Sequence, residues 1–200
     1  MPAALAAAPD PFEPKVYAAL AESLEPGALV WVASSMPIRD VETFFPRTDR
    51  RIRFLSNRGA NGIDGVVSSA LGAALAADRR CVLLTGDLSL VYDLGGVVAL
   101  RRHPDALTIV CVNNGGGGIF DFLPVAAHAD PAAYEELIAT PSGVDLAAVA
   151  ALGGLRHARA SSPAEVRAAA AEPGLVEVRT DRRANVARHR DVFAAVTAAL

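Results

Sequence analysis

Several kinds of residue are scarce in this chain, and each scarcity narrows the functions it can have. The 200 residues include two cysteines, one tryptophan and only 6% aromatic residues. Cys81 and Cys111 fall inside predicted strands, and neither has a second cysteine or a histidine at metal-ligand spacing. No hydrophobic run approaches the roughly 20 residues that span a bilayer. We therefore expect two buried free thiols, a reducing cytoplasmic location and no membrane insertion.

The chain also carries little excess charge of either sign. The formal net charge of −3 argues against a nucleic-acid surface. The basic stretch from Arg47 to Arg53 contains Asp49 and no aromatic side chain, so it is interpreted as a solvated connection. Residues 1–5 lack the positive charge of a secretory leader. The four histidines are scattered along the chain, and no chemistry is assigned to them.

The pattern of hydrophobic residues predicts the fold class. Short apolar runs alternate with helical segments, which favours an α/β fold, an open parallel sheet of about six strands with helices on both faces. We expect strands near residues 29–32, 52–55, 81–85, 107–112, 155–158 and 175–178. Asp64 is expected to be the N-cap of a helix that runs to about Ala77. Residues 1–13, rich in alanine and proline, are expected to form a linker or tail before one domain over residues 14–200.

Two polar motifs follow two of the expected strands. Gly86-Asp87-Leu88-Ser89 comes directly after the first, and Asn113-Asn114 with the glycine run Gly115–Gly118 comes directly after the second. Asn114 lies 27 residues after Asp87, a gap that fits one strand–helix–strand unit, with the crossover helix expected over 92–102. Both motifs should therefore lie at the carboxyl edge of the sheet, where open α/β sheets bind ligands.

The residue types in the two motifs suit a metal and a diphosphate. A carboxylate, an amide oxygen and a backbone carbonyl opened by glycine form an oxygen-only set of the kind that Mg²⁺ prefers. Backbone N–H groups in a glycine turn can hold a diphosphate, and Ser89 adds a hydroxyl. Either half alone is more simply explained, Asp87 as a helix cap and Asn113-Asn114 as a turn. Both halves at this spacing favour a metal–diphosphate site.

The two motifs resemble the cofactor motif of the thiamin diphosphate-dependent enzymes, normally Gly-Asp-Gly followed after one crossover by Asn-Asn. By this resemblance, Asp87, the Asn114 side chain and the Gly116 carbonyl would bind Mg²⁺, with Mn²⁺ as an alternative. Gly86, Leu88 and Ser89 would contact the thiamin diphosphate. Leu88 stands where the usual motif has glycine, and this departure narrows the family instead of breaking the match.

Further stretches resemble one branch of these enzymes, the 2-succinyl-5-enolpyruvyl-6-hydroxy-3-cyclohexene-1-carboxylate synthases of menaquinone biosynthesis. The most specific is Ser56-Asn57-Arg58-Gly59-Ala60-Asn61-Gly62-Ile63-Asp64-Gly65. The resemblance covers most of residues 28–180. It implies a transferase that decarboxylates 2-oxoglutarate and adds the succinyl semialdehyde unit to isochorismate.

The same resemblance assigns polar substrate contacts. Ser35, Arg39 and Arg58 would bind isochorismate, a dicarboxylate that guanidinium groups can hold through paired hydrogen bonds. Without the resemblance, Arg58 would be read as a surface ion pair. Ser35 could equally be an N-terminal helix cap, and the two roles are compatible.

Four apolar residues are also assigned by the resemblance. Ile63 would wedge beneath the thiazolium ring and bend the cofactor. Ile119, Phe120 and Leu123 would form the apolar wall of the substrate pocket, with Ile119 also against the cofactor. Without the family, these side chains would be taken as core.

No stretch resembles the pyrimidine-binding domain that supplies the activating glutamate in this superfamily, so no catalytic residue is assigned. The resemblance implies a C-terminal domain that is inactive without that partner domain and belongs to a homo-oligomer. Two other functions stay open, a subunit of another thiamin diphosphate-dependent 2-oxo acid decarboxylase and a non-catalytic binding or assembly module. A Rossmann-type nucleotide protein is disfavoured, because Gly115–Gly118 lacks the Gly-x-Gly-x-x-Gly frame leading into a helix.

Overall fold

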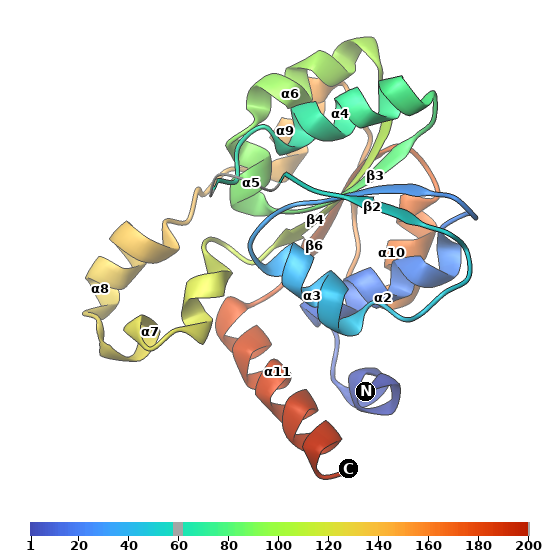
Figure 1. Cartoon of the computed structure of the whole chain (residues 1–200). Helices are drawn as coiled ribbons and strands as arrows, with labels where there is room; N and C mark the ends of the chain where they lie inside the picture. Colours follow the sequence, from blue (N-terminus) through green and yellow to red (C-terminus); the bar gives the residue numbers. More distant parts are fainter. Residues whose placement is uncertain (58–61, 200) are drawn as a thin grey trace.

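The computed structural model describes residues 1–57 and 62–199, and a parallel sheet forms its centre (Figure 1). Within these described residues, six strands lie in the order β2-β1-β3-β4-β6-β5. They are β1 (Leu29–Val32), β2 (Arg53–Leu55), β3 (Cys81–Gly86), β4 (Leu107–Asn113), β5 (His157–Arg159) and β6 (Gly174–Arg179). All of the pairings are parallel. The expected α/β fold is confirmed, and the two motif-bearing strands, β3 and β4, are neighbours.

Helices cover both faces of the sheet. In Figure 1, α4 (Val66–Ala77), α6 (Leu94–Ala99) and α9 (Leu146–Gly153) lie over one face, and α2 (Glu13–Ser23), α3 (Met36–Phe44) and α10 (Pro163–Ala170) over the other. Leu83 and Ile109 point into the core under α4, whereas Leu84 and Val110 point into the core under α2. Because successive side chains of a strand face opposite sides, a strand covered on both sides must be apolar throughout. The continuous apolar runs of β3 and β4 follow from this.

The crossover between β3 and β4 is broken into three pieces. α5 (Asp87–Val91) begins directly after β3, and α6 continues into the 3-10 turn η1 (Leu100–Arg102). Asp93 stands between α5 and α6, where its carboxylate accepts the backbone N–H groups of Gly96 at 3.2 Å and Ser68 at 2.7 Å. The helix expected over 92–102 therefore begins later, because Asp93 caps α6 and ties it to α4.

The expected N-cap role of Asp64 is wrong. α4 begins at Val66 and its N-cap residue is Gly65, so Asp64 does not hold the cap position. Gly65 has a φ of 68°, a left-handed conformation that glycine adopts without the steric cost of a Cβ atom. The backbone thus turns into α4 through a glycine instead of a side-chain cap.

The first thirteen residues pack on the rest of the chain. They include α1 (Pro2–Ala7) and the first residue of α2. Phe12 is only 1% exposed and meets Phe44 of α3 edge to face at 6.3 Å between ring centroids. Leu5 joins the same cluster with Val192 of α11 (Arg182–Thr197). The segment expected to be a linker thus buries apolar side chains, while the domain boundary itself stays a prediction.

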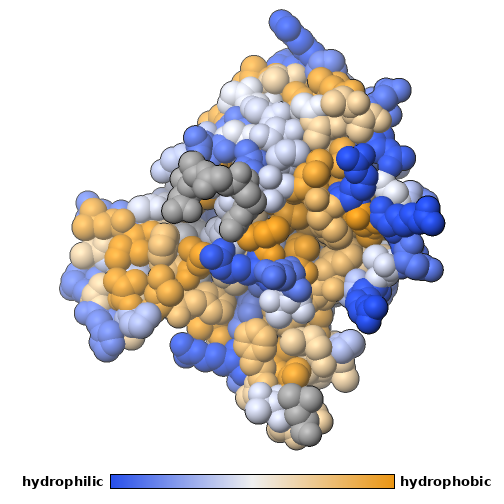
Figure 2. All heavy atoms as spheres, viewed as in Figure 1, coloured by the Kyte–Doolittle hydropathy of each residue, from blue (hydrophilic) through white to orange (hydrophobic). Residues whose placement is uncertain are grey.

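The chain between β4 and α9 extends away from the sheet (Figure 1), and we call residues 118–139 the arm. The arm comprises η2 (Gly118–Phe122), α7 (Val125–His128), α8 (Pro131–Tyr134) and the π-helical turn η3 (Glu135–Ala139). Leu123 is 49% and Leu137 72% exposed. Figure 2 shows hydrophobic surface gathered over this part of the molecule.

The structure bears on two expectations drawn from composition, the state of the cysteines and membrane insertion. Cys81 and Cys111 are buried free thiols, as expected. Within residues 1–57 and 62–199, no helix has the length and apolar character needed to cross a bilayer.

Candidate cofactor and metal site

A cavity of about 660 Å³ opens at the carboxyl edge of the sheet. The loops that follow four neighbouring strands, β1 to β4, contribute to its wall. Most of the site residues expected from the sequence line it, namely Ser35, Arg39, Ile63, Gly86, Asp87, Leu88, Ser89, Asn114, Gly116, Ile119 and Phe120. Leu123 is not among the lining residues, and Arg58 lies outside the described residues. The fold thus brings together motifs that are far apart in sequence.

Asp87 is the first residue of α5 and lies at the end of β3. Its side chain is 4% exposed. Burial raises the pKa of Asp87 to about 6, and hydrogen bonds from the backbone N–H groups of Leu88 and Gly116 offset burial only in part. The Gly116 contact joins the two motifs, since that residue belongs to the glycine turn after β4. A cation beside this carboxylate would favour its charged form.

Asn114 lies directly after β4 and has one committed and one free polar atom. Its Nδ2 donates a hydrogen bond to Oε1 of Glu13 at 3.1 Å. Its Oδ1 is buried and has no hydrogen-bond partner among residues 1–57 and 62–199. A buried amide oxygen left without a partner loses its hydration with no compensation. An amide oxygen in this state is suited to a ligand that accepts its lone pair.

The glycine turn that follows Asn114 needs glycine for two separate reasons. Gly115 and Gly116 have φ values of 75° and 138°, which residues with a Cβ atom rarely adopt. A Cβ atom at Gly116 would also collide with the backbone carbonyl of Ala139. The N–H of Gly117 donates to that same carbonyl at 2.7 Å. The arm is thereby fastened to the turn, and the turn is held close to Asp87.

Arg182, at the start of α11, fixes the other side of the turn. Its guanidinium donates to the Gly115 carbonyl at 2.9 Å, and its Nε lies 3.0 Å from Asp121. It also pairs with Glu135. Asp121 in turn accepts the hydroxyl of Tyr134 at 2.7 Å. Sequence reasoning did not single out Arg182, because its partners in the glycine turn and the arm are distant in sequence.

Ser35 and Arg39 lie at the start of α3, on the β1 side of the cavity. Ser35 occupies the N-cap position of α3, but its hydroxyl makes no capping hydrogen bond. Its φ of 74° is strained for a residue with a Cβ atom, and such strain is common at functional sites. Arg39 donates to the Ser35 carbonyl at 2.7 Å. Two roles were expected for Ser35, and the structure does not form one of them, the side-chain helix cap.

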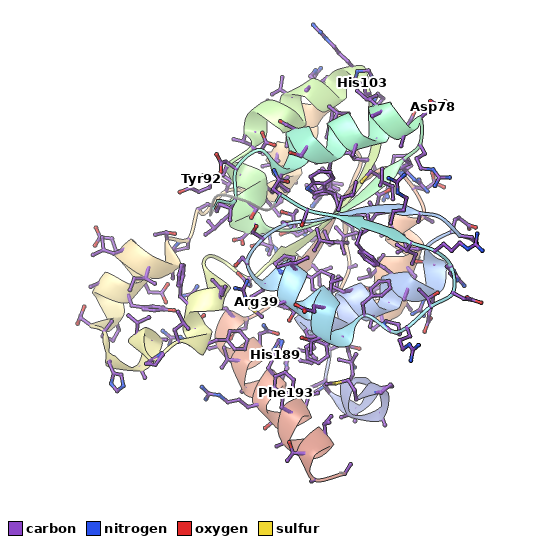
Figure 3. All side chains as sticks on the ribbon, in the orientation of Figure 1. Arg39, Asp78, Tyr92, His103, His189 and Phe193 are labelled. Carbon is purple, nitrogen blue, oxygen red and sulfur yellow. The ribbon has the colours of Figure 1, made fainter. Side chains whose placement is uncertain are left out.

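A buried polar cluster lies behind the cavity. His189 Nε2 is 3.0 Å from Asp40 Oδ1, and His189 Nδ1 donates to the Asn185 carbonyl at 2.9 Å. Phe44 and Phe193 flank the imidazole ring. Figure 3 shows His189 and Phe193 on α11 and Arg39 on α3. Burial lowers the pKa of His189, but the hydrogen bond and the charge of Asp40 outweigh burial and raise it. His189 does not line the cavity.

Glu13 is a further site residue that the sequence did not reveal. It is the first residue of α2, is 1% exposed and lines the cavity. Burial raises the pKa of Glu13 to about 7, the charge of Asp40 adds to the increase, and hydrogen bonds from Asn114 and Thr180 oppose it. A glutamate in the first turn of a helix is common on electrostatic grounds. No local signal therefore distinguished this one.

The side chains present decide whether a cation fits. Among the described residues, no group of three His, Cys, Asp or Glu side chains is placed to hold a metal. A cation at this edge would therefore complete its coordination with amide and carbonyl oxygens. Asp87, the free Oδ1 of Asn114 and the Gly116 carbonyl offer such a set. This oxygen-only set fits Mg²⁺, with coordination positions left for phosphate oxygens.

The chain belongs to a known family. Residues 38–177 match the family model described as thiamine pyrophosphate enzyme, C-terminal TPP binding domain. Fold, motif and cavity thus define a thiamin diphosphate-binding domain of this enzyme class.

Curated relatives narrow the class. The chain is 51% identical over 99% of its length to the 2-succinyl-5-enolpyruvyl-6-hydroxy-3-cyclohexene-1-carboxylate synthase of Myxococcus xanthus (strain DK1622). It is 48% identical over 93% of its length to the synthase of the same name from Geobacillus thermodenitrificans (strain NG80-2). For the Chloroflexus aurantiacus synthase the identity is 45% over 94% of the chain. The expected resemblance to the cofactor-binding domain of these synthases is confirmed.

The match covers only part of each relative. The chain spans 35%, 32% and 32% of the three synthases, about a third of their length. An X-ray structure described as a thiamin diphosphate-dependent enzyme from Mycobacterium smegmatis has the same fold. It superimposes with a TM-score of 0.64 at 23% identity, over 85% of this chain and 31% of that one.

Proposed function

We propose that this chain is the diphosphate- and metal-binding part of a synthase that decarboxylates 2-oxoglutarate and adds the succinyl semialdehyde unit to isochorismate in menaquinone biosynthesis. One observation carries the proposal. Asp87 and Asn114, whose Oδ1 has no partner among the described residues, line one cavity next to a glycine turn. The chain is 51% identical to the matching third of such a synthase. Thiamin diphosphate supplies the electron sink for decarboxylation when it is bound.

The residues of the chain have distinct roles in this proposal. Asp87, Asn114 Oδ1 and the Gly116 carbonyl hold Mg²⁺ or Mn²⁺, and the cation neutralises the diphosphate. Gly86, Leu88 and Ser89 contact the cofactor, because they line the cavity beside Asp87. Ile63 and Ile119 line the same cavity and provide apolar contacts for the cofactor rings.

The substrate contacts form the outer part of the site. Ser35, Arg39 and Arg58 bind the carboxylates of isochorismate, with Arg39 held in place by its hydrogen bond to the Ser35 carbonyl. Phe120 and Leu123 are 40% and 49% exposed and form an apolar wall for the substrate. No residue of this chain is proposed as the activating acid or base.

The partner of the site is a pyrimidine-binding domain of the same enzyme. Without it the chain binds but does not turn over substrate. The exposed apolar side chains of the arm, Leu123 and Leu137, support a homo-oligomeric assembly. The two free thiols support a reducing, cytoplasmic location. We assign the cofactor-binding domain to residues 14–200, and Glu13, directly before this range, completes the wall of its cavity.

A calorimetric titration tests the cofactor site. Thiamin diphosphate is added to the chain with and without Mg²⁺, for the wild type, Asp87→Ala and the control Asp105→Ala, an exposed aspartate at the opposite edge of the sheet. We expect Mg²⁺-dependent binding that Asp87→Ala loses by at least about 100-fold, or about 2.7 kcal/mol, and that Asp105→Ala keeps. Equal binding with and without Mg²⁺ would contradict the metal site.

Adding a pyrimidine-binding domain tests the reaction. Restored turnover of 2-oxoglutarate with isochorismate supports the synthase. A preference for simple aldehyde acceptors would instead favour another 2-oxo acid decarboxylase. Association of the two domains without any turnover would favour a binding or assembly module.

A further inference from the structure

The side-chain amide of Asn114 has a nitrogen and an oxygen that can form hydrogen bonds, and in the described residues only the nitrogen forms one. Its Nδ2 donates to Glu13 Oε1 at 3.1 Å, whereas its Oδ1 is buried and meets no hydrogen-bond donor in the described part of the chain. The amide is closely surrounded, since a Cβ atom at Gly118 would lie 2.6 Å from Asn114 Nδ2. If the amide turned over, its oxygen would face the Glu13 oxygen and the hydrogen bond would be lost. The direction of the amide is therefore set by Glu13.

Glu13 is itself held from a second side. Thr180, which follows β6, donates its hydroxyl to Glu13 Oε1 at 2.9 Å. The backbone N–H of Thr180 donates to the Asn113 carbonyl at 3.0 Å. Thr180 thus links the glutamate to the end of β4, the strand that carries Asn114. The acceptor oxygen is fixed relative to the amide it receives.

We infer that Glu13 is a positioning residue for the cofactor site, which holds the Asn114 amide with its oxygen free for the cation. Glu13 does not touch the cation; it acts through Asn114. The inference rests on the proposed metal site, but the contact that carries it is present in the metal-free chain. Charged and neutral carboxyl groups both keep an acceptor oxygen, so the role of Glu13 does not depend on its protonation.

Three variants separate the hydrogen bond from packing. Glu13→Met has a similar length and no strong acceptor, so it removes the hydrogen bond and preserves bulk. Glu13→Gln keeps an acceptor oxygen and should restore the contact. Glu25→Met, at an exposed glutamate just after α2, is the matched control.

The first readout is the affinity for Mn²⁺ in the presence of thiamin diphosphate, measured by the electron paramagnetic resonance signal of free Mn²⁺. We expect Glu13→Met to bind Mn²⁺ at least tenfold more weakly, Glu13→Gln within about threefold of the wild type, and Glu25→Met unchanged. Mn²⁺ affinity within twofold of the wild type for a folded Glu13→Met would overturn the inference.

The second readout is the side-chain amide signal of Asn114 in the metal-free protein, measured by NMR. We expect its protons to exchange with water at least tenfold faster in Glu13→Met than in the wild type, with Glu13→Gln close to the wild type. An unchanged exchange rate in Glu13→Met would overturn the inference. The absence of Mn²⁺ binding in the wild type would count against the proposed function, while the NMR comparison would still decide the role of Glu13.

Discussion

Two buried glutamates hold the two adjacent asparagines at the end of β4. Glu177, on β6, accepts Asn113 Nδ2 at 2.8 Å, and Glu13, on α2, accepts Asn114 Nδ2 at 3.1 Å. Both glutamates are at most 1% exposed. Nevertheless, the pKa of Glu177 is lowered to about 2, whereas that of Glu13 is raised to about 7.

The neighbours of the two carboxylates explain the difference. Burial disfavours the charge of both. At Glu177, hydrogen bonds from Arg179 at 2.7 Å and Arg159 at 3.1 Å outweigh burial. At Glu13, both donors are neutral and the charge of Asp40 adds repulsion. Cations facing a buried carboxylate therefore decide its charge, and they make Glu177 a stabilising group while Glu13 costs stability beside the cavity.

Removing Glu177 should have the largest effect on stability. Glu177→Ala leaves Asn113, Arg159 and Arg179 without their common acceptor, so we expect the free energy of unfolding to fall by about 3 kcal/mol. Chemical denaturation of the variant beside Glu172→Ala, an exposed glutamate, measures this loss. If Glu177→Ala lowers the free energy of unfolding no more than Glu172→Ala does, Glu177 is not the stabilising group that distinguishes it from Glu13.

Acid should expose the contribution of Glu177. Its pKa in the folded protein is about 2, below the ordinary value of 4.5, so its stabilisation is present above pH 4.5 and is lost as the pH falls toward 2. We expect a loss of about 2 kcal/mol over this range. Denaturation at several pH values should show a shallower acid slope for Glu177→Gln. Equal slopes would mean that Glu177 is not the responsible group.

Glu13 should act in the opposite direction and in another pH range. Its folded pKa of about 7 lies above 4.5, so its contribution is present below pH 4.5 and is lost as the pH rises through 7. In the metal-free chain, Glu13→Gln should remove about 2 kcal/mol of this decline between pH 4.5 and 8. Chemical denaturation of the wild type and of Glu13→Gln is measured at several pH values. The difference between the two series gives the contribution of Glu13 alone, because all other titratable groups are the same in both. A decline that Glu13→Gln leaves intact would refute the raised pKa.

The two asparagines should separate stability from binding. Asn113→Ala removes one hydrogen bond to a charged group and should cost about 1 kcal/mol. Asn114→Ala removes a bond to a carboxyl that is partly neutral, so its stability should change by less than Asn113→Ala. Its Mg²⁺-dependent binding of thiamin diphosphate should be lost instead. Thermal denaturation and calorimetry on both variants make the comparison, and equal effects on binding would contradict it.

Single arginines around Glu177 should matter least. The side chain of Arg159 is 57% exposed, and an exposed ion pair contributes little because water screens it. We expect Arg159→Gln to lower the free energy of unfolding by about 0.5 kcal/mol in chemical denaturation. A loss above about 2 kcal/mol would show that Arg159 alone sets the state of Glu177.

The parts of the site that the sequence predicted share a local origin. Asp87 and Asn114 each follow a continuous apolar run, and a run of that kind indicates a buried strand whatever the rest of the chain does. Gly116 was assigned by the resemblance to the cofactor motif, within a glycine run that indicates a sharp turn. The N-cap assigned to Asp64 failed because Gly65, the next residue, makes the turn through its backbone. When two neighbouring residues could each begin a helix, the packing of the helix decides which one does.

By itself, the sequence determined the α/β class and the edge of the sheet where the motifs meet, and it indicated the residues that we propose as oxygen ligands. These features follow from strand periodicity and from the order of motifs along the chain. Only the tertiary structure decided which side chains support the ligands. Glu13 meets Asn114 across 101 positions and Thr180 across 167. No local pattern records such contacts, because they exist only after α2 has packed beside the ends of β4 and β6.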